Sequence, residues 1–228
     1  MQRHFDEELQ QLKEKLLRMS SLVEGVIATS IKALLERNQE LAEKAIEMDN
    51  AIDMFEIEID EISLRLLALY QPQAGDLRFI TSTMRINNDL ERIGDLAVNI
   101  AQRSIDLLKV PPMKSLTDIV EMAKATQEMV KDSLNSFVNK DSKLAENVCA
   151  RDDIVDNYNH VIFRKLLTDK PQKQSDIERA IDLILVAKNL ERIADHSTNI
   201  AEDVIYMVEG KTIKHHILEQ GSEKDPSI

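Results

Sequence analysis

A segment of 13 residues occurs twice in this 228-residue chain, at positions that differ by 100. Residues 89–101 match residues 189–201 position for position at Leu, Glu, Arg, Ile, Asp, Asn, Ile and Ala. Upstream, a weaker similarity continues at an offset of 103, as between residues 41–43 and 144–146. One structural unit is therefore used twice, which restricts the chain to architectures with two similar halves.

The hydrophobic pattern predicts helices in both halves. Gly (5) and Pro (5) are scarce, and no stretch alternates apolar and polar residues as a strand would. Apolar residues instead recur every three or four positions, which is typical of a helix that buries one face. The longest stripe comprises Leu41, Ala45, Met48, Ile52, Phe55, Ile59, Ile62, Leu66 and Leu69. Two further stripes comprise Ile86, Leu90, Ile93, Ala97 and Ile100, and Leu183, Leu190, Ile193, Ile200 and Val204.

Polar and proline-containing segments separate the predicted helices. Residues 71–76 predict a turn, with Asp76 as the N-cap of the next helix, and residues 169–176 repeat this turn in the second half. Weaker breaks at Asn38 and at residues 139–141 separate the first and second helices of each half.

The predicted fold class is therefore all-α, with two tandem, pseudo-symmetric antiparallel three-helix bundles. The first bundle comprises residues 1–112 and the second residues 113–220, and the two are joined near Pro111–Pro112. Residues 221–228 are rich in small and charged residues and predict a flexible tail.

Composition excludes several classes of protein. The net charge of −12 argues against general nucleic-acid binding, which requires a basic surface. A single cysteine, Cys149, excludes an internal disulfide and a cysteine-rich metal site. No apolar run approaches the roughly 20 residues that span a bilayer, and the first residues show no signal-peptide pattern. We expect a soluble, cytoplasmic protein that does not span the membrane.

Acidic residues line the helices beside the apolar stripes. Each copy of the repeat places Glu, Asp and Asn four residues apart on one helix face, at Glu91, Asp95 and Asn99 and at Glu191, Asp195 and Asn199. A second acidic row lies on the preceding helix, at Asp49, Asp53, Glu56 and Asp60, with a shorter counterpart at Asp152, Asp156 and Asn159. If these helices pack antiparallel, the two rows of each half face each other across a groove and repel unless a positive charge intervenes.

Two interpretations of the acidic rows remain open. Carboxylate oxygens suit Mg²⁺, Mn²⁺, Ca²⁺ or iron, whereas a structural zinc site would use thiolates. Alternatively, the rows are solvated helix edges whose charges pair with basic side chains such as Arg92 and Arg192. The recurrence of Glu-x-x-x-Asp-x-x-x-Asn in both halves favours a metal or ligand site but does not exclude the solvated edge.

No enzymatic constellation accompanies the acidic rows. A ferritin-like di-iron site requires Glu-x-x-His, which neither copy contains, because His196 follows Asp195 directly. The chain also lacks a glycine-rich phosphate loop, a nucleophile elbow and a His-Glu-x-x-His motif. We therefore predict no catalytic residues and no organic cofactor.

The repeated motif resembles the PhoU family of phosphate-signalling proteins. The resemblance is carried by residues 88–101 and 189–201, by the Asp-x-x-Ile-Asp string at 49–53, and by Tyr206 to Lys211, and it extends from about Phe5 to His215. It implies two three-helix bundles in tandem and a regulatory role without catalysis. Family members restrain phosphate-starvation signalling by linking the ATPase of a phosphate ABC transporter to a membrane sensor histidine kinase, and commonly form homodimers.

The resemblance also implies a set of metal ligands. Some family members bind multinuclear iron or other metal clusters, zinc among the expected metals, through the Glu/Asp-x-x-x-Asp motifs. Carried over, the ligands are Glu91, Asp95, Asp49 and Asp53 in the first half and Glu191, Asp195, Asp152 and Asp156 in the second. The alternative function is a metal-independent helical module whose acidic rows dock basic surfaces of partner proteins.

Overall fold

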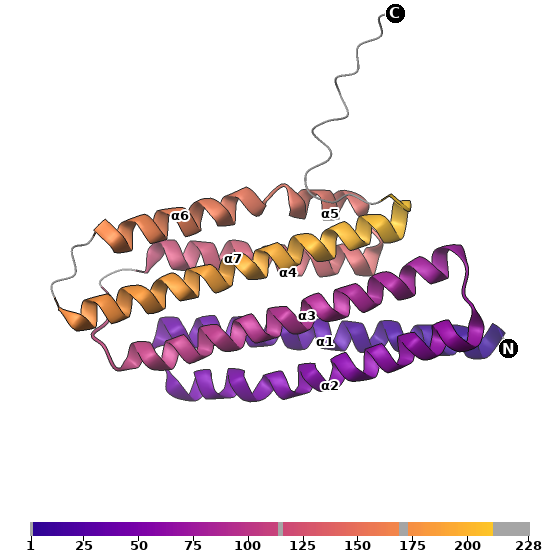
Figure 1. Cartoon of the computed structure of the whole chain (residues 1–228), viewed down its shortest axis with the longest axis horizontal. Helices are drawn as coiled ribbons and strands as arrows, with labels where there is room; N and C mark the ends of the chain where they lie inside the picture. Colours follow the sequence, from indigo (N-terminus) through magenta and orange to yellow (C-terminus); the bar gives the residue numbers. More distant parts are fainter. Residues whose placement is uncertain (1, 114–115, 169–172, 212–228) are drawn as a thin grey trace, which may run out of the picture.

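The computed structural model of the chain describes residues 2–113, 116–168 and 173–211. Within these ranges the protein forms α-helices and no strands (Figure 1). The helices are α1 (Gln2–Glu36), α2 (Gln39–Tyr70), α3 (Ala74–Leu108), α4 (Thr117–Asn139), α5 (Ser142–Cys149), α6 (Asp152–Thr168) and α7 (Gln174–Glu209). None of the helices in the described ranges is both long and apolar enough to cross a membrane.

The helices pack as two antiparallel bundles that lie side by side. α1, α2 and α3 form the first bundle, and α4, α7 and the pair α5–α6 form the second (Figure 1). α3 and α7 pack against each other along the middle of the molecule and join the two bundles. The predicted all-helical architecture of two three-helix bundles is confirmed.

Two of the predicted helix breaks have a clear chemical basis. The side chain of Asn38 accepts a hydrogen bond from the Leu41 backbone N–H at 3.2 Å and caps α2. Asp141 does the same for α5 by accepting from the Leu144 N–H at 3.0 Å. Each cap satisfies a backbone donor that the first turn leaves unpaired, so a new helix begins at the predicted place.

The predicted N-cap at Asp76 is wrong. α3 already begins at Ala74 with Gln73 in the capping position, and no side chain caps this end through a hydrogen bond. Asp76 lies within the first turn, where its negative charge interacts favourably with the helix dipole. Asp is common at both kinds of position, so the sequence does not separate them.

The apolar stripes form the core. Every predicted stripe residue of α3 and α7 is buried, and most of the α2 stripe is buried or half-buried. Leu69 is the exception, because 65% of it is exposed. At this end of α2 the neighbouring Tyr70 takes the inward place, where its ring packs on Phe5 with centroids 5.3 Å apart.

The second bundle departs from the predicted pattern of three continuous helices. The helix that corresponds to α2 is interrupted at Ala150 and Arg151, so that α5 and α6 follow one another along the edge of the molecule (Figure 1). Arg151 Nη2 donates to Asp132 Oδ2 of α4 at 2.6 Å, which anchors the break to the neighbouring helix. Residues 169–172 of the predicted turn at 169–176 lie outside the described ranges, as does the whole predicted tail at 221–228.

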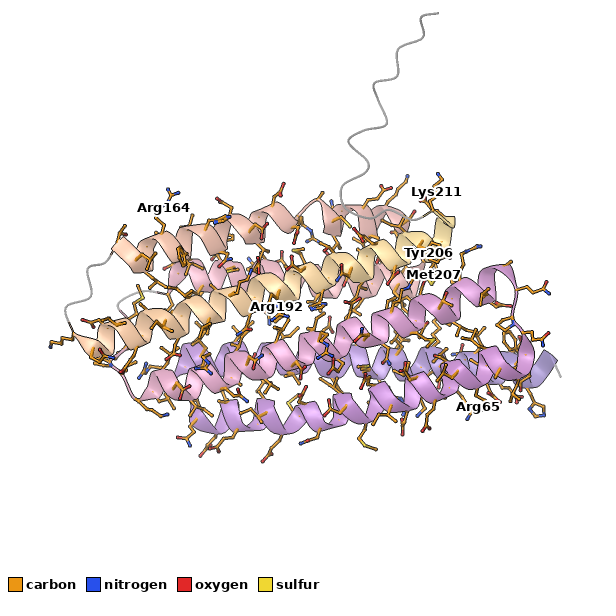
Figure 2. The ribbon with its side chains drawn as sticks, in the orientation of Figure 1. Arg65, Arg164, Arg192, Tyr206, Met207 and Lys211 are labelled. Atoms are coloured by element: carbon orange, nitrogen blue, oxygen red, sulfur yellow. The ribbon has the colours of Figure 1, made fainter. Side chains whose placement is uncertain are left out.

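Polar contacts run along the interface between α3 and α7. Arg85 pairs with Asp203 at 2.9 Å, and Arg103, near the C-terminal end of α3, pairs with Asp182 at 3.3 Å. The Arg85 guanidinium also lies 5.6 Å from the ring centroid of Tyr206, which Figure 2 labels near the end of α7. Charged pairs spaced along both helices fix the register of one bundle on the other.

Candidate metal centres

The first acidic cluster comprises Asp49, Asp53 and Glu56 of α2 with Glu91 and Asp95 of α3. Antiparallel packing brings the two rows together, as the sequence predicts. The pKa of Asp49 is raised to about 6, first because burial removes water from the carboxylate and then because Asp53 and Asp95 repel its charge. Residues from both helices therefore share one electrostatic environment.

Glu91 is a largely buried member of this cluster, with 15% of its side chain exposed. Its pKa is raised by burial and by the negative charge of Asp95, while Arg92 opposes the shift. Arg92 Nε lies 3.2 Å from Glu91 Oε2, and Arg92 Nη1 lies 3.1 Å from Asp95 Oδ2. The pairing expected of a solvated edge is thus present, but Arg92 is half-exposed and one cation does not balance five carboxylates.

A glycine lets Asp49 approach α3 closely. A Cβ atom at Gly94 would lie 2.7 Å from Asp49 Oδ1 and 3.1 Å from Ile52 Cδ1. The missing side chain therefore leaves the space that the Asp49 carboxylate occupies. In the second copy the same position is Ala194, which is fully buried.

The second acidic cluster comprises Asp152 and Asp156 of α6 with Glu191 and Asp195 of α7. The pKa of Asp152 is raised to about 6 by burial and then by the charges of Asp195 and Asp156. The pKa of Asp195 is also raised, again mainly by burial and next by Glu191, while Lys188 opposes the shift. The four predicted ligands of the second half are therefore brought together like those of the first.

The basic partner differs between the two clusters. In the second, Lys188 Nζ contacts Glu191 Oε1 at 2.6 Å from one turn before the motif. Arg192, which the sequence suggested as a partner, forms no ion pair with the residues that the structure describes. A single cation thus approaches the motif glutamate in each half, from a different position.

Asn199 does not belong to the second cluster. Its Nδ2 donates to Asp89 Oδ1 of α3 at 3.3 Å, and His196 Nδ1 lies 2.8 Å from the same oxygen. Asp89 was not recognised as a candidate from the sequence. The available signal was the mismatch between the copies, since Asp89 corresponds to Asn189 and His196 to Leu96.

The donor chemistry of both clusters fits a hard cation. The candidate ligands of each groove are carboxylates. Cys149 lies close enough to Asp152 for their charges to interact, but its thiol pKa is raised to about 11, chiefly by burial, so the thiol is protonated at neutral pH. In both halves Oε2 of the motif glutamate is out of contact with water and lies beside a basic side chain: Arg92 Nε is 3.2 Å from Glu91 Oε2, and Lys188 Nζ is 2.5 Å from Glu191 Oε2. A metal ion bound in either groove would therefore compete with this basic side chain for the glutamate oxygen.

The carboxylates are near one another but not in a coordinating arrangement. Throughout residues 2–113, 116–168 and 173–211, no three Asp, Glu, His or Cys side chains are placed so that one ion could contact them all. Rotation of the Asp and Glu side chains is therefore required before an ion could be held between the helices.

Comparison with known proteins gives one consistent result. The PhoU domain matches residues 16–104 and, separately, residues 119–204. A protein of Aquifex aeolicus named phosphate-specific transport system accessory protein PhoU homolog is 44% identical over 215 residues, which cover 94% of this chain and 97% of that protein.

Solved structures agree with the sequence comparison. The crystal structure of PhoU from Pseudomonas aeruginosa has a TM-score of 0.87 and 37% identity, and covers 91% of this chain and 100% of that chain. The phosphate transport system regulatory protein PhoU from Streptococcus pneumoniae has a TM-score of 0.84 and 29% identity, and covers 92% of this chain and 100% of that chain. This chain belongs to the PhoU family.

Proposed function

We propose that this protein regulates phosphate uptake and phosphate homeostasis from the cytoplasm. It links the ATPase of a phosphate ABC transporter to a membrane sensor histidine kinase and restrains phosphate-starvation signalling. The observation that carries the proposal is the near full-length similarity to a phosphate-specific transport system accessory protein, 44% identical over 94% of the chain. We expect it to act as a homodimer without enzymatic activity.

We further propose that each acidic cluster binds metal ions. Asp49, Asp53, Glu91 and Asp95 would hold one ion or cluster, and the ligands of the second half are Asp152, Asp156, Glu191 and Asp195. Burial is the main cause of the raised pKa values of Asp49 and Asp152, and repulsion by neighbouring carboxylates adds to it. Bound cations would neutralise this repulsion and would link the two helices of each groove. Oxygen ligands favour iron, Mn²⁺ or Mg²⁺ over zinc.

The regulatory role is tested by replacing the chromosomal gene. Deletion should switch on a phosphate-starvation reporter in phosphate-rich medium, and the wild-type chain should silence it again. Glu91→Ala with Asp95→Ala should restore silencing only partly, whereas Glu61→Gln, on an exposed position of α2, should restore it fully. A reporter that stays silent after deletion would contradict the regulatory role.

A second candidate function has its own support. Apolar side chains extend the faces of α6 and α7 beyond the second acidic cluster: Phe163, Leu167, Ile177 and Ile181, each at least 42% exposed. An acidic groove next to exposed apolar side chains suits a basic amphipathic segment of a partner protein. On this alternative the clusters act without metal.

Partner binding separates the two candidates. If the acidic groove docks a basic segment directly, binding to the transporter ATPase should weaken steeply with salt and ignore chelators. If ions are required, a chelator should abolish binding at constant ionic strength. The comparison uses the untagged full chain, because a histidine tag would itself bind metal.

A further inference from the structure

A cavity of about 510 Å³ lies at the end of the molecule where the two bundles meet. Its lining comes from the first turns of α1 and α3 and the last turns of α4 and α7, which gather at one end of the molecule in Figure 1. The volume is within the range of roughly 300–1,000 Å³ that is usual for small-molecule sites, which often lie between domains.

The cavity has an apolar wall. Phe79 of α3 and Phe137 of α4 stack with ring centroids 5.7 Å apart and an interplanar angle of 24°. Leu9 of α1 and Met207 of α7, the latter labelled in Figure 2, extend this surface. Phe137 and Met207 are only 3% and 6% exposed, so the accessible part of this wall comes mainly from the half-buried Leu9 and Phe79, which suit a flat apolar group.

Three of the five charged side chains that line the cavity are basic, although the protein as a whole is acidic. Lys13, Arg78 and Lys140 line it together with Asp6 and Asp76, whereas the chain carries a net charge of −12. Neither Lys13 nor Lys140 forms an ion pair with a described residue. Two unpaired ammonium groups beside an apolar surface attract an anion.

Arg78 is held in place by the second bundle. Its Nε donates to the Met207 carbonyl at 3.4 Å, and Gly210 leaves room beside its guanidinium, whose atoms come within 3.8 Å of where a Cβ would lie. The guanidinium is therefore oriented at the cavity edge by the end of α7, and an anion bound there would contact both bundles.

The repeat shows that this cavity is not a by-product of duplication. One hundred residues further on, Arg78 is replaced by Glu178 and Phe79 by Arg179. Arg179 instead pairs with Asp176 at 2.9 Å and donates to the Pro111 carbonyl at 3.1 Å. The basic and aromatic lining therefore occurs at one end of the first bundle and has no counterpart in the second.

We propose that this cavity binds a phosphate-bearing small molecule with a flat apolar body, of the size of a nucleoside diphosphate. Lys13, Lys140 and Arg78 hold the phosphate groups, since lysine, arginine and the nearby N-terminus of α3 are the donors that phosphate prefers. The ring system lies on the apolar wall. Because the ligand contacts α1, α3, α4 and α7, it stabilises one orientation of the two bundles.

Calorimetric titration of the full chain with ADP tests this proposal. Lys13→Ala combined with Lys140→Ala should weaken ADP binding at least about tenfold, since both cations contact the phosphates. Lys44→Ala combined with Lys143→Ala makes the same charge change on exposed positions outside the cavity and should leave the affinity unchanged. The ring-proton NMR signals of Phe79 and Phe137 should shift on binding.

Two further probes separate the parts of the ligand. Adenosine and inorganic phosphate should each bind at least about tenfold more weakly than ADP, because each lacks one of the two contacts. The absence of ADP binding up to about 5 mM, or equal affinity in the Lys13/Lys140 variant, would overturn the proposal. Phosphate binding as tightly as ADP would overturn the role of the apolar wall.

Discussion

At the residue scale, the raised pKa of Asp49 makes the stability of the metal-free protein depend on pH. A carboxyl group whose pKa rises from 3.8 in the unfolded chain to about 6 on folding binds extra protons in the folded state between these values. The free energy of unfolding should therefore increase as the pH falls from 7.5 toward about 5. The charged Asp49 carboxylate lowers the free energy of unfolding by its full amount only at pH values above its folded-state pKa of about 6.

The variant Asp49→Asn removes this titration. In chelator at pH 7.5 it should be more stable than wild type by about 1 kcal/mol, after allowance for the partial exposure of the carboxylate. At pH 5 the difference should shrink, as measured by urea unfolding at both pH values. Glu61→Gln makes the same charge change on an exposed part of α2 and should show no such pH dependence. If the stability of both variants changed with pH in the same way, the pH dependence would not come from the raised pKa of Asp49.

The close approach at Gly94 gives a second residue-scale prediction. Gly94→Ala gains about 1 kcal/mol of helix propensity but forces Asp49 and Ile52 to move, which costs about 1–3 kcal/mol. We expect thermal unfolding to occur at a lower temperature, with weaker metal binding at the first cluster alone.

Gly25 provides the matched control. A Cβ there would meet only the flexible end of Met48, at 3.2 Å, so Gly25→Ala should be neutral or stabilising by up to about 1 kcal/mol. If both alanine variants were equally stable, Gly94 would not be needed to seat Asp49.

At the element scale, the stability of the α3–α7 interface should depend on Asp89. Its carboxylate serves both His196 and Asn199 of the other bundle, and both Asp89 and His196 are less than one-fifth exposed. Asp89→Ala should lower the free energy of unfolding by about 1–3 kcal/mol, because a largely buried polar network loses its acceptor.

A double-mutant cycle of Asp89→Ala and His196→Ala measures the direct contribution. We expect a coupling energy of about 0.5–3 kcal/mol from urea unfolding at pH 6. Glu36→Ala, which removes an exposed pair with Lys32 on α1, should cost well under 1 kcal/mol. A coupling energy near zero would show that the contact does not stabilise the joined bundles.

The helices were predictable because apolar residues recur with helical spacing. The stripes of α3 and α7 are buried as expected, and the short polar side chains of Asn38 and Asp141 cap the helices that begin after them. The interruption between α5 and α6 was not predictable in the same way. It depends on Arg151 reaching Asp132 of α4, a contact 19 residues away in sequence that periodicity does not encode.

The acidic residues were also predictable as groups, since i, i+4 spacing places them on one face. Their surroundings were not. Gly94 carries no signal of the Asp49 carboxylate that fills its space, and the choice of Lys188 over Arg192 as the partner of Glu191 depends on tertiary packing. The sequence therefore identifies which carboxylates gather, while the structure shows how far each is buried and neutralised.

At the scale of the whole molecule, duplication produces two similar acidic grooves, one on each bundle. Each groove joins the last helix of its bundle to the preceding one, and α3 and α7 carry the motif while also packing against each other. A cation bound in either groove would therefore stabilise a helix that also forms the interface between the bundles.

Metal content is the most direct test of this account. Elemental analysis of untagged protein should find bound metal in both halves. The variant Glu91→Ala with Asp95→Ala should carry roughly half of this amount, and so should the separate variant Glu191→Ala with Asp195→Ala. All four substitutions together should remove it, while circular dichroism shows that the fold is intact. Wild-type protein that carries no metal, and takes up none when iron, Mn²⁺ or zinc is supplied, would contradict the account.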